Sequence, residues 1–575
     1  MARTMTPGAS TDADLPPYDP ARLLGLPFPE RVRLVCRSFA AQAHPTPRIV
    51  MAMYWLKYLL VYVGGWAFFV SRSAGYPGVA APGTWAFTAV AFHKAILWSI
   101  FYELMGFGCG MGPMNARFNP PLGGFLHFLR PGTTKLPLVP GAPLVGGIRR
   151  TWLDVALYAA NQLCLVRALL APDVTPVLMW PSVVLIPLLG VTDKTLFLAA
   201  RAEHYWVALV CLTVAHAGDL WLSACKPIWC AIWFWAATSK LNRHFPSVIM
   251  VMMSNGPFFP RWLKERLFVA YPDDLRPSRF AALMAHGGTV VEYLIPVGLL
   301  LAAAHPVPTA LMLVVMACFH GFIAINNPSG MPIEWNILMI YGGVFLFGVH
   351  PEARVATVVG APALAAFLVF CLAVVPCFGN FVPARCSFLL AMRYYAGNWA
   401  YNIWLVRKGS AAKFRKLVKA AGTFREQLEK LLSDPVAVDA AITLAMAHRF
   451  MHFEGRPLLE ALPQAVDDID AYEWMEGEVL GGMVLGWNYG DGHLNGTQLL
   501  AAVQAQCGFE PGEVRVVMVE SQPLFGRGMT WQIVDAASGV LTRGETLLAP
   551  MRAVQPWPTG RFADAFARGR SGAVA

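Results

Sequence analysis

The stretch WFWAATSKLNRHFPSV, residues 233–248, places Lys240 at the end of a long apolar run that is rich in tryptophan. An amine held among indole rings with little water would be a neutral base near pH 7, because burial disfavours the charged ammonium form. At the membrane surface, the same lysine would instead be an anchor whose ammonium group reaches the lipid head groups. The residue type and its position leave both interpretations open.

Three other ionisable side chains stand where an apolar environment is expected. Glu292 interrupts one apolar run, His320 ends another, and His204 stands at the start of a third. An ionisable group at membrane depth costs several kcal/mol unless it has a partner, so each of these residues is a functional candidate. Taken alone, His204 is more often a histidine satisfied by a carbonyl group than a catalyst.

The segment AINNPSGMPIEWN, residues 324–336, combines polar side chains with Pro and Gly residues that break a helix. At membrane depth, irregular backbone is tolerated only where it is buried in protein or lines a wet cavity. We therefore expect a cavity wall here, and an aqueous turn between two spans is the alternative. The residues assigned to this cavity are Glu292, Asn326, Asn327, Glu334, Arg243 and Trp235.

The elements that position these residues are predicted to be membrane-spanning helices. Of the 575 residues, 56% are hydrophobic and only 14% are charged, which is too apolar for an ordinary soluble protein. Windows long enough to cross the bilayer lie at 51–70, 86–107, 152–170, 220–239, 281–304, 306–325 and 355–378, and weaker ones at 175–191, 196–217 and 335–349. The predicted fold is an all-α polytopic membrane helical bundle of about 9–10 spans with a C-terminal cytoplasmic α+β domain.

The chain is predicted to have four parts: a cytoplasmic N-terminal arm at 1–50, a transmembrane helical domain at 51–380, a linker at 381–410 and a soluble α+β domain at 411–575. Arg and Lys concentrate in alternate loops, which predicts that both termini are cytoplasmic and that the protein lies in the inner (plasma) membrane. Within the arm, PERVRLVCRSFAAQAH is either a basic amphipathic helix on the membrane face or a loosely ordered segment.

Composition also narrows the partners. The eleven cysteines are scattered singly, without a CxxC pair or a Cys/His cluster at zinc spacing, so neither a disulfide framework nor a metal site is expected. The net charge of +10 comes from loops between apolar runs, and orientation in a bilayer explains it better than nucleic-acid binding does. The expected partners are the lipid bilayer and a lipophilic small molecule, and the sequence specifies no protein partner.

Two families share features with this sequence. FWAATSKLNRHFPSV resembles the AGxxKL…W signature of the vitamin K-dependent γ-carboxylase superfamily, whose membrane part is the horizontally transferred transmembrane helix (HTTM) domain. DKT at 193–195 and FHGFIAINNPSGMPIEWN at 319–336 resemble the flanking pattern, and the likeness covers about 150–350. Where the superfamily usually carries a glycine before its lysine, this chain reads AATS. The layout of the whole chain more closely resembles an actinobacterial family of multi-pass membrane proteins of unknown function.

The carboxylase resemblance implies a chemistry. In that superfamily the motif lysine is the base that begins oxygen-dependent oxidation of a reduced quinone, and the product is a strong base for reaction at a peptide glutamate. Lys240 matches that lysine, while His204 and His320 match polar residues that orient groups or stabilise developing negative charge. The implied cofactor is a reduced menaquinone, and the implied activity is carboxylase-like, epoxidase-like or oxidoreductase-like, on a quinone or isoprenoid. The alternatives are a lipid-binding or transport protein without catalysis, and a membrane scaffold for the soluble domain.

The C-terminal region contains signals for both helices and strands. EVRVVMVESQPL and MTWQIVDAASGVLTRGETLL predict strands, the second with a turn at 537–539. AAKFRKLVKAAGTFREQLEKLL at 411–432 predicts a basic helix that lies on the membrane surface or packs on the loops. VAVDAAITLAMAHRFMHFEGRPLLEAL predicts a buried helix.

Two histidine patterns in this region are ambiguous. His448 and His452 have the i, i+4 spacing of a metal pair, but no third ligand accompanies them, and a packed helix face is the commoner explanation. In GWNYGDGHLNGTQLL, Asp491 and His493 either bind a substrate or cation or belong to a turn that precedes a helix.

Overall fold

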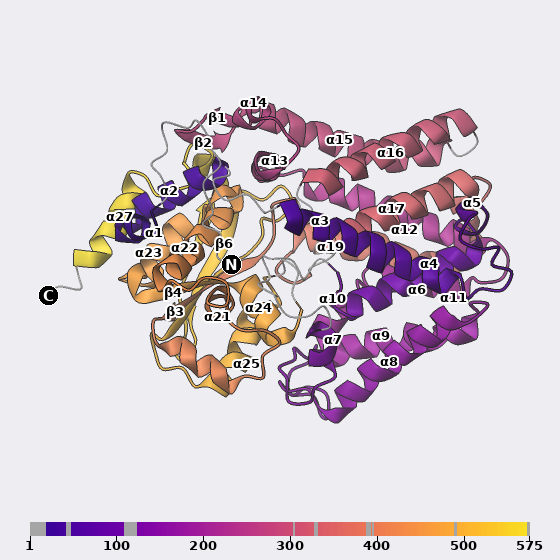
Figure 1. Cartoon of the computed structure of the whole chain (residues 1–575), viewed down its shortest axis with the longest axis horizontal. Coiled ribbons are helices and arrows are strands. Elements are labelled where there is room, and N and C mark those ends of the chain that lie inside the picture. Colours follow the sequence, from indigo (N-terminus) through magenta and orange to yellow (C-terminus); the bar gives the residue numbers. More distant parts are fainter. Residues whose placement is uncertain are drawn as a thin grey trace.

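A computed structural model describes residues 19–41, 48–108, 123–302, 305–326, 332–386, 393, 396–487 and 492–571. Its helical bundle and its α+β domain lie next to each other, with the domain at one end of the bundle (Figure 1). One continuous hydrophobic cluster runs from the bundle into the domain, from Phe92 through Trp233 to Trp404.

Six helical stretches in the described part of the chain are long and apolar enough to cross a membrane. They are α3–η1–α4 (Arg48–Lys57, Tyr58–Val63, Gly64–Val70), α8 (Trp152–Leu170), α12 (Leu220–Ser239), α15 (Arg279–Ala302), α16 (Pro306–Asn326) and α18–η6–α19 (Pro362–Val369, Phe370–Val374, Val375–Phe381). All six fall on windows predicted from the sequence. The seventh strong window holds the shorter α6 (Ala89–Leu104), whose side chains are almost all buried.

The weaker windows correspond to shorter helices. These are α9 (Pro176–Thr192), α10 (Lys194–Ala199) with α11 (Tyr205–Val214), and α17 (Ile333–Gly343) with η4 (Val344–Val349). The break between α10 and α11 contains Arg201, whose φ of 51° lies in the left-handed region. A non-glycine residue there interrupts a helix, so this part of the chain does not form one long span.

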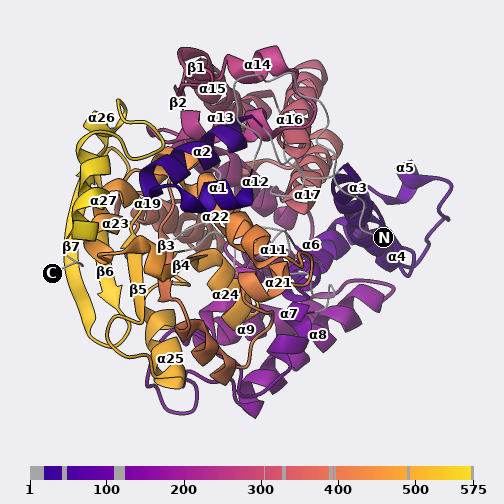
Figure 2. The same ribbon diagram turned by 60° about the vertical axis from the view of Figure 1, so that its left-hand side comes forward.

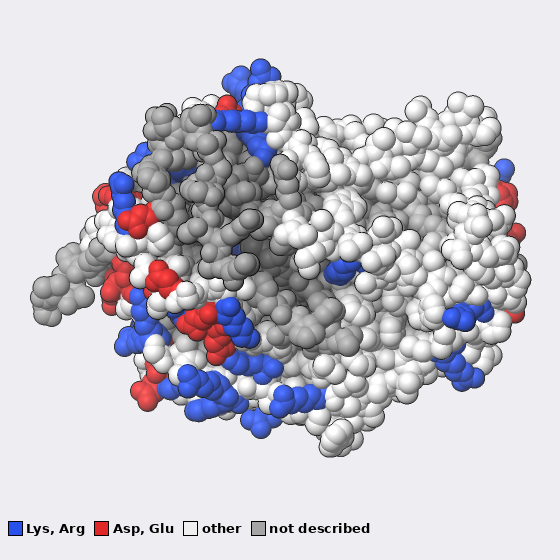
Figure 3. Space-filling view, in the orientation of Figure 1, with Lys and Arg blue, Asp and Glu red and all other residues white. Residues whose placement is uncertain are grey.

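Buried lysines tie together the loops at the end of the bundle that lies away from the domain. Lys94 Nζ donates to the carbonyl oxygens of Phe69 and Ala171, both at 2.8 Å. Lys226 Nζ donates to the carbonyl oxygen of His350 at 2.8 Å. Charged side chains gather over the domain and at this far end, with little charge on the surface between them (Figure 3). An uncharged band of that kind suits contact with lipid.

The domain is built on an antiparallel sheet in the order β4-β3-β5-β6-β7. Its strands are β3 (Tyr401–Arg407), β4 (Tyr472–Glu476), β5 (Val514–Val519), β6 (Gly528–Asp535) and β7 (Gly539–Leu547). The strands predicted at β5, β6 and β7 and the turn between the last two are confirmed. β3 lies in the segment predicted as a linker, although it pairs with both β4 and β5.

Residues alternate between the two faces of this sheet, as the period of a strand requires. Ile403 and Leu405 pack into a cluster with α22 (Pro435–Met451) and α23 (Leu458–Ala465). Trp404 and Val406 belong instead to the cluster shared with the bundle, as do residues of α24 (Gly477–Leu485) and α25 (Thr497–Cys507). Figure 2 shows β5, β6 and β7 at one side of the molecule.

The amphipathic helix predicted in the N-terminal arm is α2 (Phe28–Ala40). Its apolar residues pack on the domain: Val32 and Cys36 lie in the cluster that contains Phe450 of α22. The apolar face of α2 therefore covers protein, and the N-terminal helices lie at the same end of the bundle as the domain (Figures 1 and 2).

The segment 411–432 does not form the single basic helix predicted from its spacing. It contains η7 (Ser410–Lys416) and α21 (Phe424–Leu428), separated by extended chain. Thr423 and Glu426 form a capping box that begins α21, and such a cap marks a new helix start. The remaining short elements are α1 (Pro20–Gly25), α5 (Pro82–Trp85), α7 (Gly123–Phe128), α13 (Phe245–Asn255), α14 (Arg261–Glu265), β1 (Phe268–Ala270), β2 (Asp274–Pro277), η5 (Val355–Gly360), η8 (Phe453–Gly455), η9 (Ile469–Ala471), α26 (Leu548–Met551) and α27 (Arg561–Ser571).

Candidate functional site

Lys240 forms an ion pair with Glu292 inside the bundle. Lys240 directly follows α12, and Glu292 lies midway along α15, which packs against α12. The Lys240 Nζ to Glu292 Oε2 distance is 2.5 Å, and the two side chains are only 9% and 5% exposed. The amine is therefore not an anchor among lipid head groups. The carboxylate offsets the cost of burying the ammonium.

Aromatic rings complete the surroundings of the amine. Its nitrogen lies 5.4 Å from the centre of the Phe245 ring and 5.9 Å from that of Phe319. A cation within about 6 Å of a ring centroid is attracted by the electrons of the ring face. These contacts add to the ion pair in a place with almost no exposed surface.

The pair lines a cavity of about 470 Å³, which we call the Lys240 cavity. Its walls come from α12, α13, α15, α16 and α17, and they are mainly apolar, with side chains such as Ile232, Met252 and Phe322. The volume lies in the range of pockets that hold small organic ligands, about 300–1,000 Å³. A few polar groups within an otherwise apolar wall suit a lipophilic molecule with one polar end.

The Lys240 cavity reaches the outer surface of the bundle along α15. Leu283, which lines it, is 70% exposed. Gly287 and Gly288 also line it, and a Cβ atom added at either would meet no atom within 4 Å. The surface around Leu283 belongs to a helix apolar enough to face lipid. A hydrophobic ligand could therefore enter sideways from the bilayer, without passing through water.

His320 lines the same cavity, and its partners fix its protonation state. The indole nitrogen of Trp233 lies 2.9 Å from His320 Nε2, and Asn336 Oδ1 lies 2.8 Å from Nδ1. An indole N–H can only donate, so Nε2 accepts and Nδ1 carries the proton. Asn336 Nδ2 donates to the carbonyl oxygen of Pro332, which supports this orientation of its amide. His320 is thus a neutral ring with both nitrogens engaged, which positions Trp233 and Asn336.

Asn326 is the fourth predicted residue that lines the Lys240 cavity. Its amide nitrogen donates to the carbonyl oxygen of Phe322 at 2.8 Å. Its Oδ1 is buried and has no hydrogen-bond partner among the described residues. That oxygen can accept a hydrogen bond from a ligand in the cavity.

His204 and Glu334 lie in a separate polar cluster on the other side of Trp335. The His204 ring meets the Trp335 ring edge-on at 4.8 Å between centroids. The guanidinium of Arg201 lies 4.8 Å from the Trp335 ring centre and 3.5 Å from Glu103. Glu334 is fully buried. It lies two residues before Asn336 on α17, and residues two apart on a helix point in different directions, so Glu334 faces away from Asn336. A void beside His204 measures about 10 Å³, which holds no more than one water.

The structure places the remaining predicted residues away from the Lys240 cavity. Arg243 is exposed and does not line it. Trp235 points toward η6, where its indole nitrogen donates to the carbonyl oxygen of Leu372 at 2.7 Å. Asn327 and Asp491 lie outside the described residues.

Sequence reasoning missed two features of the site. Trp233, the partner of His320, is one of several tryptophans in α12, and spacing alone does not single it out. Arg201 and Glu103 form a buried ion pair between segments almost a hundred residues apart. The signal for that pair was present, since each charge interrupts an apolar run and a charge there needs a partner.

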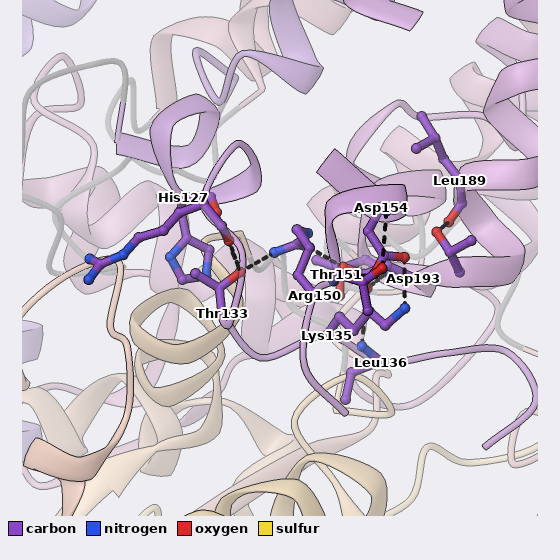
Figure 4. A network of polar contacts seen from close by, with 12 residues as sticks. His127, Thr133, Lys135, Leu136, Arg150, Thr151, Asp154, Leu189 and Asp193 are labelled. Carbon is purple, nitrogen blue, oxygen red and sulfur yellow. Dashed lines mark hydrogen bonds and ion pairs between the residues drawn. The ribbon is translucent and has the colours of Figure 1, made fainter. Parts of the chain in front are cut away.

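Asp193, from the DKT segment, belongs to a structural network (Figure 4). Its carboxylate pairs with Arg150 and accepts from the backbone N–H of Thr195 at 3.1 Å. Beside it, Lys135 pairs with Asp154 at 2.7 Å. All four charged side chains are at most 1% exposed. The network fastens the loop before α8 to the starts of α8 and α10.

The described residues offer no metal centre, because no group of three or more His, Cys, Asp or Glu side chains is close enough to hold an ion. The rings of His448 and His452 meet edge-on at 4.6 Å between centroids. His452 Nδ1 donates to the carbonyl oxygen of His448 at 2.7 Å. Burial lowers the pKa of His452 to about 4, so this ring is neutral at pH 7.

Comparison with known proteins gives one match. A family model described as a transmembrane protein of unknown function (DUF3556) matches residues 9–565. No curated protein and no solved structure matches the chain.

Proposed function

Because the chain belongs to this family of transmembrane proteins of unknown function (DUF3556), we propose that it is a multi-pass membrane protein that binds a lipophilic molecule of the quinone or isoprenoid class beside Lys240. The observation that carries the proposal is the Lys240–Glu292 ion pair in an apolar cavity that reaches the outer surface of the bundle. A buried ion pair adds little stability compared with apolar residues of similar size. We therefore infer that the pair acts on a bound ligand and is not there mainly for stability.

The proposed chemistry is proton transfer at a hydroxyl group of the ligand. Lys240 must lose a proton before it can accept one, and Glu292 Oε2, at 2.5 Å, is within reach to take it. The neutral amine is then the base, and an oxygen such as Asn326 Oδ1 can orient the hydroxyl. In this scheme His320 is a positioning residue, because both of its ring nitrogens are engaged. His204 lies behind Trp335, and we assign it no contact with the ligand.

A carboxylase-like, epoxidase-like or oxidoreductase-like reaction on a reduced menaquinone is the finer form of this proposal. Support comes from the resemblance of the Lys240 segment to the HTTM domain and from the position of Lys240 in a cavity. We also propose, from the layout of the whole chain, that the protein is related to an actinobacterial family of multi-pass membrane proteins. A second candidate function is lipid binding or transport without catalysis, which the apolar walls and the lateral opening favour equally.

The membrane arrangement is also a proposal beyond the six long helices. If α6, α9, α11 and α17–η4 cross the membrane as well, the chain spans it about ten times. An even number agrees with the packing of α2 on α22, which brings the N-terminal helices to the domain side. The excess of Arg and Lys in the loops of that side supports a cytoplasmic domain and location in the plasma membrane.

Native mass spectrometry of the full-length protein, released from its own membranes, tests ligand binding. We expect a retained quinone or isoprenoid, and Gly287→Leu should lower its occupancy about tenfold by filling the opening of the cavity. Gly321→Leu is the matched control, because a Cβ there also meets no atom within 4 Å but Gly321 does not line the cavity. A ligand retained equally by both variants would refute binding in this cavity, and an empty wild-type protein would favour the scaffold alternative.

Lys240→Met separates an enzyme from a binding protein. If Lys240 is the base, this variant should retain the ligand and lose turnover of the bound molecule. Turnover is measured as a mass change of the retained molecule after incubation in air. Unchanged turnover in Lys240→Met would refute the base assignment.

A further inference from the structure

A second and larger cavity of about 1380 Å³ lies where the membrane bundle meets the α+β domain, and we call it the junction cavity. It shares no lining residue with the Lys240 cavity among the described residues. The motif GWNYGDGHLNG contributes His493 to its wall. The inference drawn from it does not depend on the chemistry proposed for Lys240.

One wall of the junction cavity is apolar and comes from the membrane helices. Phe197 of α10, Trp206 of α11 and Phe370 of η6 are among its residues. Phe197 lies on the short α10 and Trp206 at the start of α11, while Phe370 lies midway along the span α18–η6–α19. Phe370 is 57% exposed and Val191 is 39% exposed, so the apolar wall continues onto the outer surface of the bundle. A lipid chain at this level of the bilayer would meet an apolar path inward.

The opposite wall is polar and comes from the sheet. Asn402, Met518, Gln532 and Arg543 occupy one row across β3, β5, β6 and β7, because each is the register partner of the next. All four line the cavity. Side chains in such a row share one face of the sheet.

The neighbouring row on the same face is apolar. Trp404, Val516 and Val534 are register partners and are at most 6% exposed. They belong to the cluster that contains α24 and α25. The face of the sheet is therefore apolar where helices cover it. In the row that meets the cavity, Asn402, Gln532 and Arg543 are polar and Met518 alone continues the apolar cluster, so this end of the face offers polar groups to a ligand.

The charges on the cavity wall favour an anionic partner. Arg385 and Arg543 line it, and neither makes an ion pair with any described residue. Glu520 also lines it, but His493 Nε2 lies 2.9 Å from its carboxylate, and the backbone N–H and hydroxyl of Ser521 donate to it at 2.8 and 2.9 Å. Burial raises the pKa of Glu520, but these hydrogen bonds outweigh burial and hold it below its ordinary value. Glu203 is the other carboxylate on the wall, and Lys194 is a third basic residue there.

We propose that the junction cavity binds an anionic phospholipid, whose phosphate-bearing head group carries a net negative charge, taken from the leaflet on the domain side. The hydrocarbon chain lies against Phe197, Trp206 and Phe370, and the head group meets the polar row of the sheet. Arg543 and Arg385 contact the phosphate, since a guanidinium donates two parallel hydrogen bonds to such a group. The domain thereby holds a lipid head group that has left the plane of the bilayer.

Two native cysteines report occupancy without a new label. Cys371 and Cys386 line the junction cavity, whereas the exposed Cys318 on α16 does not. Full-length protein in detergent micelles is mixed with dioleoylphosphatidylglycerol or dioleoylphosphatidylcholine, and N-ethylmaleimide modification of each cysteine is followed by peptide mass spectrometry. We expect phosphatidylglycerol to slow modification of Cys371 and Cys386 about tenfold more than phosphatidylcholine does, with Cys318 unchanged.

Variants connect this protection to the arginines. Arg385→Gln with Arg543→Gln should abolish the difference between the two lipids, and both side chains are exposed, so the fold should tolerate the change. Arg552→Gln, an exposed arginine outside the cavity, is the control. Absence of protection by either lipid would overturn the site. Equal protection by both, or an intact difference in the double variant, would overturn the anionic head group. Lys240→Met should leave the protection unchanged, so the two proposals can fail separately.

Discussion

At the scale of single residues, the ion pair of Lys240 and Glu292 defines the candidate site. An ammonium and a carboxylate, each nearly buried, neutralise one another beside an apolar cavity. Removing one partner leaves the other as an uncompensated charge, which is more costly than removing both. The pair is therefore open to a double-variant test that does not require a known ligand.

Lys240→Met should lower the free energy of unfolding by about 3–5 kcal/mol, because it leaves the Glu292 carboxylate alone in the cavity wall. Adding Glu292→Gln should recover a large part of that loss. The measurement is reversible unfolding of the full-length protein in mixed micelles. A double variant no more stable than Lys240→Met would show that the two groups do not compensate one another.

A second prediction at this scale concerns the tautomer of His320. The indole of Trp233 requires an unprotonated Nε2, so the ¹⁵N spectrum of histidine-labelled protein should contain a neutral ring protonated at Nδ1. Trp233→Phe should remove the hydrogen bond and shift the Nε2 resonance. The exposed His305, between α15 and α16, gives a reference signal from a ring outside the bundle interior. A doubly protonated His320 at pH 7 would contradict the assignment.

At the scale of elements, the junction of β4 and α24 gathers three carboxylates around one arginine. Arg449 lies 2.9 Å from Glu476, 3.5 Å from Glu454 and 3.6 Å from Glu478. One guanidinium cannot neutralise three charges, so the folded protein is more stable when some of these carboxyls remain protonated. Burial raises the pKa of Glu478 from 4.5 to about 7 and raises that of Glu454 still further.

This cluster predicts how stability depends on pH. Between pH 4.5 and about 7 the folded protein holds a proton on Glu478 that the unfolded chain has released. The contribution of Glu478 to the free energy of unfolding should therefore be greatest below pH 4.5 and fall as the pH rises through this window. Glu478→Gln cannot ionise and should flatten the fall, while the exposed Glu429→Gln should not. Unfolding midpoints from pH 4.5 to 8 provide the measurement, and equal slopes in both variants would contradict the prediction.

The elements also show what the sequence could and could not predict. Long apolar windows predicted the six long helices because hydrophobicity over about 20 residues is a local property. The prediction of a single basic helix at 411–432 is wrong. The spacing of its apolar residues is that of a helix, but the capping box at Thr423 begins the separate helix α21. The strand Tyr401–Arg407 could not be predicted from alternation, because every residue but the last is buried. A strand buried on both faces does not alternate between apolar and polar residues.

At the scale of the whole molecule, the Lys240 cavity could be anticipated only in part. Lys240, Glu292, His320 and Asn326 meet there because each is a polar residue at membrane depth, and that signal is readable in the sequence. Trp235 and Arg243 are close to Lys240 along the chain but lie away from the cavity. Trp235 is on another face of α12, and Arg243 is exposed in the bend between α12 and α13. The junction cavity depends on strand register and on the docking of the domain, and neither can be read from local pattern.

The arrangement of the ends makes a prediction at this scale. Glu30 of α2 and Glu510 of the domain are exposed at the same end of the molecule, whereas Asp219 is exposed in the turn before α12 at the opposite end. Single cysteines introduced at these positions are tested with a membrane-impermeant thiol reagent. Glu30→Cys and Glu510→Cys should react from one side of the membrane, and Asp219→Cys should react from the other. Sealed vesicles of both orientations give the measurement. Reaction of all three from one side would refute the crossing of the bundle.

The packing of α2 on α22 has a consequence for synthesis of the protein. Val32 and Cys36 emerge from the ribosome about four hundred residues before Phe450, against which they are finally buried. While the intervening helices are inserted, the apolar face of α2 is not yet buried against α22. During that time α2 must be bound at the bilayer surface or by a chaperone. α22 then closes over α2, and this part of the fold is complete only when the two helices have met.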